Sequence, residues 1–271
     1  MKTFARQIIA IGGLALSLLT VFAPAAIAPA RAAYVVAPDV VVFCEPTLQH
    51  TITDLGALWR KQTGIPVRVF TSPTWALLEQ ISHRARSDIV IGEGEAASNA
   101  ATERHLIRPG TLQRLWRNQL VVAATVDEIA NAKSTSPSRA YNLAALAGNG
   151  PIALVDPATA LAGAEGKRAL QALGLWEAVS SRSVGVVDTA DASYLLAEGK
   201  VQLALVYATD VAADPAFAVT DRFPASSYAQ IVYWIAQTHN ALSPNAENFV
   251  AFLHHAQAQE RPRADGLEVL P

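Results

Sequence analysis

Cysteine is nearly absent from this chain of 271 residues, which contains only Cys44. A single cysteine excludes an intramolecular disulfide and any metal site built from several thiolates. Cys44 follows Val42 and Phe43, whereas small residues are expected before a lipid-modified cysteine. The sequence therefore predicts neither a disulfide-stabilised fold nor a lipid anchor at this position.

Long apolar runs are lacking beyond the N-terminus. There, Lys2 and Arg6 precede an apolar run over residues 8–22, and Ala-Arg-Ala at 30–32 offers a cleavage site. The run is short for a membrane-spanning helix, and small residues and prolines follow it. This pattern favours a signal peptide over residues 1–32 that is cleaved on export, rather than a membrane anchor.

Basic residues are too few for a nucleic-acid-binding chain. Cleavage after residue 32 removes three of the 21 Lys and Arg residues and none of the 23 acidic ones. The mature chain then carries about five net negative charges and no basic stripe, which argues against nucleic acid as a partner.

Sequence signatures of catalysis and of metal binding are missing as well. Neither G-x-S-x-G nor H-E-x-x-H occurs, and Gly-Glu-Gly-Glu at 92–95 fits neither the dinucleotide nor the phosphate-loop pattern. The six histidines show no metal-ligand spacing. We therefore expect no enzyme activity, no cofactor and no cation ligands.

Strand and helix patterns alternate along the rest of the chain. Strands are predicted at 40–43, 67–70, 88–91, 120–124, 152–155, 184–187, 203–207 and 231–236, and helices at 48–63, 75–84, 96–106, 164–173, 190–197 and from Ser243-Pro244 to 255. Residues 127–149 predict a surface loop with a short helix. This alternation predicts an α/β fold with mostly parallel sheets and helices on both faces.

Three segments carry a resemblance to a known family: Asp156-Pro157 through Gly163, Ala169 through Trp176, and Leu205-Val-Tyr-Ala-Thr-Asp210. With them the chain resembles the periplasmic molybdate-binding proteins, the solute-capturing subunits of ATP-driven importers. The resemblance implies a two-lobed periplasmic-binding-protein fold of type II. Lobe 1 would comprise residues 33–119 and 232–271, and lobe 2 residues 120–231. It also implies a monomer that binds molybdate or tungstate and delivers it to a membrane permease.

The candidate ligand site is formed where strands end and helices begin. Helix N-termini bind anions because their first N–H groups lack partners within the helix and the helix dipole is positive there. The resemblance implies hydroxyl and N–H donors at Thr47 and Thr74, backbone N–H donors at Ala162 and Thr189, and a phenol donor at Tyr207. The alternative is that these residues are ordinary helix caps and a core tyrosine.

The first-lobe half of this site departs from the family. Cys44-Glu45-Pro46, Pro73 and Trp75 stand where the family has small residues. Strand alternation places Glu45 on the same side as Thr47. A carboxylate about 5 Å from a dianion costs roughly 7 kcal/mol at an effective dielectric near 20, more than the ~1 kcal/mol of one helix end. Glu45 therefore points away, is protonated, or faces a ligand that is not a bare dianion.

Two alternative functions stay open at this point. The same scaffold is compatible with a protonated oxyanion, a small organic acid, or a cation bound through Glu45 and Cys44. A secreted enzyme that uses Cys44 or Glu45 is the third hypothesis. It requires a histidine or an acid within hydrogen-bond reach of either residue.

Overall fold

The fold is described by a computed structural model that covers residues 39–135, 150–158 and 160–270. The predicted signal peptide over residues 1–32, and positions 136–149 of the predicted loop, lie outside these ranges and stay predictions. All of these described residues belong to one compact unit. Among the helices in the described ranges, none is long and apolar enough to cross a bilayer.

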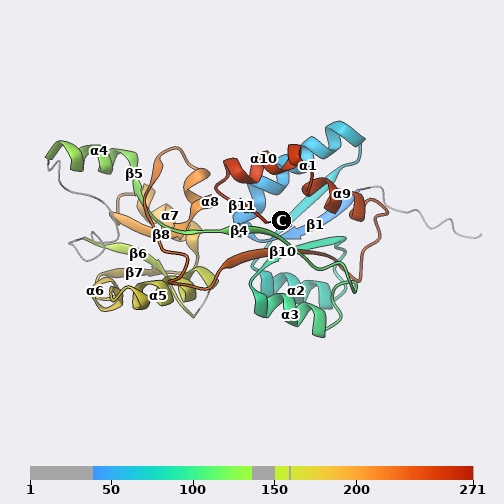
Figure 1. Cartoon of the computed structure of the whole chain (residues 1–271), viewed down its shortest axis with the longest axis horizontal. Helices are drawn as coiled ribbons and strands as arrows, with labels where there is room; N and C mark the ends of the chain where they lie inside the picture. The colour runs from blue at the N-terminus through green and yellow to red at the C-terminus, as the bar shows by residue number, and fades with distance from the viewer. Residues whose placement is uncertain (1–38, 136–149, 159, 271) are drawn as a thin grey trace, which may run out of the picture. The chain divides into compact units, whose positions relative to one another are not determined.

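The first sheet has six strands in the order β11-β4-β10-β3-β1-β2 (Figure 1). Its strands are β1 (Val40–Cys44), β2 (Val67–Thr71), β3 (Ile89–Glu93), β4 (Gln113–Asn118), β10 (Ile231–Gln237) and β11 (Glu268–Val269). β1 pairs in parallel with β2 and β3, while β10 runs antiparallel to β3 and β4. The parallel strands thus end at a common edge, and the returning chain extends the sheet beyond them.

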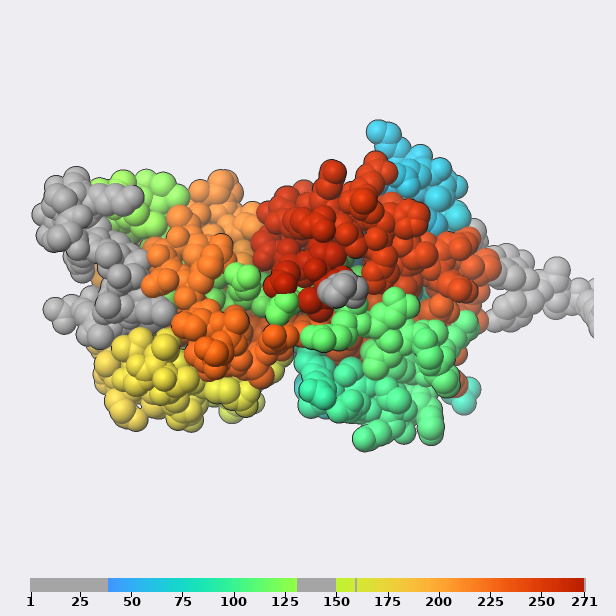
Figure 2. Space-filling view, in the orientation of Figure 1, coloured from blue at the N-terminus to red at the C-terminus, as the bar shows by residue number. Residues whose placement is uncertain are grey.

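Helices cover both faces of this sheet. One face packs against α1 (Gln49–Thr63), α9 (Ala246–Leu253) and α10 (Ala256–Ala264), and the other against α2 (Thr74–Ser82) and α3 (Glu95–Glu103). In Figure 1, α1 and α10 lie above the strands of this sheet and α2 and α3 below them, and in the space-filling view red atoms of the C-terminal segment lie above green and blue-green atoms (Figure 2). Both faces of β1 and β3 are therefore buried, which explains their continuous apolar runs.

The second sheet has five strands in the order β7-β6-β8-β5-β9. Its strands are β5 (Leu120–Thr125), β6 (Ile152–Val155), β7 (Ser183–Val186), β8 (Leu203–Tyr207) and β9 (Phe217–Arg222). The helices α5 (Leu161–Ala172) and α6 (Trp176–Ser180) pack on one face, and α7 (Thr189–Ala197) and α8 (Ala208–Ala212) on the other. Helix α4 (Val126–Thr135) follows β5 and corresponds to the short helix predicted in that region.

The α/β fold class is confirmed, but the sheets are mixed rather than mostly parallel. Strands that alternate with helices pair in parallel, whereas β5 and β10 form antiparallel ladders with their neighbours. The strands β4, β9 and β11 were not predicted from the sequence. β4 carries Arg114 and Arg117 among its apolar residues, and β11 is only two residues long, so neither has a continuous apolar run.

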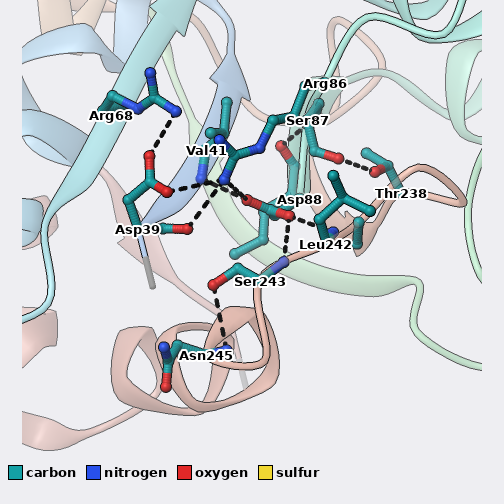
Figure 3. Close-up of polar contacts among 12 residues, drawn as sticks. Asp39, Val41, Arg68, Arg86, Ser87, Asp88, Thr238, Leu242, Ser243 and Asn245 are labelled. Carbon is teal, nitrogen blue, oxygen red and sulfur yellow. Dashed lines mark hydrogen bonds and ion pairs between the residues drawn. The ribbon is translucent and has the colours of Figure 1, made fainter. Parts of the chain in front are cut away.

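The last predicted helix begins later than its sequence suggested. We expected Ser243 to be its N-cap, yet α9 starts at Ala246 after Asn245, and a separate helix, α10, follows. The Ser243 hydroxyl accepts the backbone N–H of Asn245 at 3.3 Å, while its own N–H donates to the carboxylate of Asp88 at 2.8 Å. Asp88 is fully buried before β3, and it also accepts the N–H groups of Val41 and Leu242 (Figure 3). It thereby joins β1 to the segment that follows β10.

Candidate functional site

A cavity of about 500 Å³ is lined by strand ends of both sheets and by the N-termini of helices that pack on them. It is lined by all five predicted ligand-binding residues, and by four of the residues singled out in the first-lobe half. The lining includes Thr47, Thr74, Ala162, Thr189 and Tyr207, together with Glu45, Pro46, Pro73 and Trp75. The structure thus brings the candidate residues together, while their binding of a ligand stays a prediction.

Glu45 faces the cavity and does not point away from it. It follows β1 directly and is only 7% exposed. Its Oε1 atom accepts hydrogen bonds from both the backbone N–H and the hydroxyl of Thr74, the first residue of α2. The helix end that we predicted to receive a ligand is therefore already bonded to an acid of the chain itself.

A second glutamate, Glu93, was missed by the sequence analysis. It ends β3, lines the cavity and donates its backbone N–H to the Thr74 hydroxyl oxygen at 2.9 Å. Its Oε2 accepts a hydrogen bond from the phenol of Tyr207 at 3.4 Å. Its position at the carboxyl end of a buried strand was the available signal, because such ends meet at one sheet edge.

The two glutamates share an environment that favours their neutral forms. Burial raises the pKa of Glu45, although the hydrogen bonds from Thr74 act in the opposite direction. Burial, and then the neighbouring charge of Glu45, raise the pKa of Glu93 well above its ordinary value. Burial also keeps the pKa of Tyr207 well above 10, so its hydroxyl remains a donor.

The second-sheet side of the cavity is held in shape by Asp210. Its carboxylate accepts the backbone N–H of Tyr207 at 2.8 Å and the hydroxyl of Thr189 at 3.2 Å. These bonds fix the end of β8 against the start of α7, and burial raises the pKa of Asp210 to about 6. The Thr189 hydroxyl is thus used within the protein, which leaves its backbone N–H as the donor in the first turn of α7.

Ala162 occupies the first turn of α5, close to the end of β6. The neighbouring Gly163 permits this approach, because a Cβ atom there would lie 2.5 Å from the backbone oxygen of Asp156. A glycine at this position therefore lets the N-terminus of α5 reach the cavity.

Thr47 is part of a chain of hydrogen bonds that joins the two sheets. Its hydroxyl is hydrogen-bonded to the hydroxyl of Tyr233 at 2.8 Å, and the Tyr233 oxygen accepts a hydrogen bond from the side-chain amide of Asn118 at 3.0 Å. The same amide donates to the hydroxyl of Thr209 in α8 at 3.0 Å. Tyr233 and Asn118 were not candidates in the sequence analysis, and they position Thr47 from β10 and from the end of β4.

Cys44 is placed differently from the other candidates. It is fully buried at the end of β1, and it is not among the residues that line the cavity. Burial, followed by the charge of Glu45, raises its pKa to about 12, so the sulfur is a thiol at neutral pH. A buried thiol is a poor nucleophile and a poor metal ligand, which weighs against both roles considered for Cys44.

The chemistry of the cavity is that of hydroxyl, amide and carboxyl groups. No Lys, Arg or His belongs to its described lining. Within the described ranges, no group of three or more His, Cys, Asp or Glu residues is arranged to hold a metal ion. The arrangement can hold a small polar ligand by hydrogen bonds.

Comparison with known proteins identifies the family. Residues 40–268 match the bacterial extracellular solute-binding protein family. The molybdate-binding protein ModA of Escherichia coli strain K12 is 28% identical over 244 residues, which cover 89% of this chain and 94% of that protein. This similarity confirms the predicted resemblance.

Solved structures agree in fold. The periplasmic molybdate-binding protein of Azotobacter vinelandii has a TM-score of 0.72 and 23% identity, and the match covers 86% of this chain and 100% of that one. The substrate-binding domain of a putative molybdenum ABC transporter from Clostridium difficile has a TM-score of 0.72 and 18% identity, over 86% and 99% of the two chains. The two-lobed fold is thus confirmed, and the chain belongs to the bacterial extracellular solute-binding protein family.

Proposed function

We propose that this protein is the periplasmic solute-binding subunit of an ABC importer and captures a molybdate- or tungstate-like oxyanion in the cavity. The observation that carries the proposal is the meeting of the first turns of α2, α5 and α7 with Tyr207 around one cavity. The sequence similarity to a molybdate-binding protein supports the choice of ligand.

Helix N-termini suit such a ligand because their backbone N–H groups bind an anion without any positively charged side chain. Each contributes about 0.3–1 kcal/mol to binding a nearby anion, and more where it is partly buried. Donors from both sheets surround the same space, so a bound oxyanion would hold the two sheets together. This is the property that a transport protein needs to present its loaded form to a permease.

The partners and location follow from the same proposal. A membrane permease with its ATPase would receive the ligand, and the signal peptide predicted at residues 1–32 would deliver the chain to the periplasm. We expect a monomer that uses no cofactor and catalyses no reaction. The acidic lining of the cavity, with Glu45, Glu93 and Asp210, is unsuited to nucleic acid.

A small organic acid is the second candidate ligand. Trp75 and Val187 line the cavity with 54% and 62% of their surface exposed, and prolines lie beside them. A volume of about 500 Å³ falls within the ~300–1,000 Å³ range of small-molecule pockets. An organic acid would place its carboxylate at the helix ends and its carbon atoms against Trp75.

A thermal-unfolding screen of the mature chain tests the two candidates. A ligand at about 100 times its dissociation constant stabilises the folded state by about 2.7 kcal/mol. Molybdate and tungstate should raise the melting temperature over a range of pH, and sulfate serves as a tetrahedral comparison. A shift with organic acids alone would replace the first candidate by the second, and no shift with either class would contradict the proposed function.

A further inference from the structure

Two of the residues predicted to donate hydrogen bonds to an oxyanion already donate to carboxyl groups of the protein. The N–H and hydroxyl of Thr74 both donate to Glu45, and the hydroxyl of Tyr207 donates to Glu93. An arriving oxyanion therefore meets two carboxyl groups rather than free donors. The inference below rests on the proposed function, because it concerns how this site admits an oxyanion.

Two ionised glutamates would exclude a dianion. One carboxylate about 5 Å from a dianion lowers its affinity by a factor on the order of 10⁵ at an effective dielectric near 20. The described lining of the cavity offers no Lys, Arg or His to offset this repulsion. Helix ends do not compensate for it either.

We propose that Glu45 and Glu93 hold a shared proton in the ligand-bound state, and that the protonated carboxyl group donates its O–H to the oxyanion. The proton is taken from solvent or is already on the pair, and no bond other than O–H is made or broken. Protonation converts a carboxylate, which repels the ligand, into a carboxylic acid that donates a hydrogen bond to it. The other carboxyl group keeps its bond from Thr74 or Tyr207.

The carboxyl groups of Glu45 and Glu93 line the same cavity, and Thr74 ties the Glu45 carboxyl to the backbone of Glu93. The Thr74 hydroxyl donates to Glu45 while its oxygen accepts the N–H of Glu93. Two carboxyl groups that share a site resist double ionisation, as coupled acids do. The raised pKa of both glutamates has the direction that this arrangement requires.

The other titratable groups around Glu45 and Glu93 also favour retention of a proton by these two residues. Asp188 and Asp210 belong to the same cavity lining, on the second-sheet side, and they add negative charge when ionised. Tyr207, Tyr233 and the thiol of Cys44 are all buried, and burial raises the pKa of each, so they stay neutral at physiological pH. Every one of these neighbours is acidic or neutral, so none stabilises two ionised carboxylates.

The proposal distinguishes two kinds of oxyanion. Molybdate carries no proton at neutral pH and depends on the carboxyl pair for one. Hydrogen phosphate brings a hydrogen of its own, which an ionised glutamate can accept. Above the pKa of the free pair, molybdate affinity should therefore fall about tenfold per pH unit, while that of hydrogen phosphate should fall less.

Infrared difference spectroscopy tests the protonation state directly. The mature protein saturated with molybdate at neutral pH should show the C=O stretch of a carboxylic acid. This band should disappear in the double variant Glu45→Gln, Glu93→Gln, and it should persist in Glu103→Gln, a matched change at an exposed position of α3. Saturated wild-type protein without the band would overturn the proposal.

Titration calorimetry of molybdate binding at several pH values tests the shared proton and the proposed function separately. Glu45→Gln and Glu93→Gln singly, whose folding is checked by circular dichroism, should bind molybdate at least tenfold more tightly than wild type at pH about 8.5. The proposal of a shared proton would be overturned if wild type bound molybdate tightly with an affinity independent of pH. It would also be overturned if only the variants bound molybdate at every pH. Failure of molybdate to bind wild type and every variant would instead contradict the proposed function.

Discussion

Glu45 caps a helix that begins 29 residues later, because its carboxyl group accepts both the backbone N–H and the hydroxyl of Thr74. The residue before this helix, Pro73, makes no side-chain capping bond. Glu45 therefore satisfies donors that the local sequence leaves unpaired. The same contact places a carboxyl group where the resemblance expects an anionic ligand, so one residue serves folding and shapes the site.

Glu45→Ala should lower the free energy of unfolding of the ligand-free protein by about 1–2 kcal/mol, because Thr74 loses its acceptor. Urea denaturation at constant pH measures this change. Glu45→Gln keeps an acceptor oxygen and should lose less. Equal stability of both variants and wild type would show that the contact does not stabilise α2.

Tyr207→Phe should weaken oxyanion binding by about 1–3 kcal/mol, since the phenol is a donor in the cavity. The ring of Tyr207 is buried, so the overall packing is retained. Titration calorimetry measures the change in affinity. Tyr194→Phe, at a 57% exposed tyrosine of α7, is the matched control and should bind like wild type. An unchanged affinity in Tyr207→Phe would identify a core tyrosine without a ligand role.

Asp210 should make the ligand-free protein less stable as the pH rises from about 4 to about 6. Its pKa is raised from 3.8 in the unfolded reference to about 6 by burial, so the folded state binds the proton more tightly. The stability due to this proton is fully present below the lower value and is lost between the two, on the order of 2–3 kcal/mol. Asp210→Asn should remove this decrease when unfolding is measured at several pH values. The same slope in variant and wild type would rule out Asp210 as its source.

Asp88→Ala should destabilise the fold by about 3 kcal/mol or more, because three backbone N–H groups lose one buried acceptor. These groups belong to Val41, Leu242 and Ser243. Denaturant unfolding checks the loss, and Asp127→Ala at an exposed position of α4 should change stability little. Ligand affinity of the folded Asp88 variant should equal that of wild type. A large affinity change would place this network within the binding machinery.

Trp75→Ala should discriminate between the two candidate ligands. An inorganic oxyanion gains little from the exposed indole, so its affinity should change by less than about threefold. A small organic acid that packs its carbon atoms on Trp75 should lose about 1–2 kcal/mol of binding energy. Calorimetry with the ligand found in the unfolding screen measures either result. A large loss with molybdate would show that Trp75 acts on oxyanion binding.

Local patterns predicted much of the fold. Continuous apolar runs identified β1, β3, β6 and β8 because these strands are buried on both faces, and amphipathic spacing identified most of the helices. The extra antiparallel strands β4, β9 and β11 escaped detection because charged or short segments do not reveal pairing. Ser243 was expected to be the N-cap residue of the last helix, but α9 begins only after Asn245, whose N–H the Ser243 hydroxyl accepts.

The sequence by itself determined which residues stand at strand ends and helix starts, and therefore the candidates Thr47, Thr74 and Tyr207. Only the tertiary structure decided what those residues contact. Glu93 lies opposite Tyr233 because β10 returns antiparallel beside β3, more than a hundred residues later. Glu45 reaches Thr74 because β1 and β2 pair in register, with Cys44 opposite Thr71. Capping and periodicity act within a few residues of the chain, whereas the carboxyl pair depends on sheet order, which local patterns do not encode.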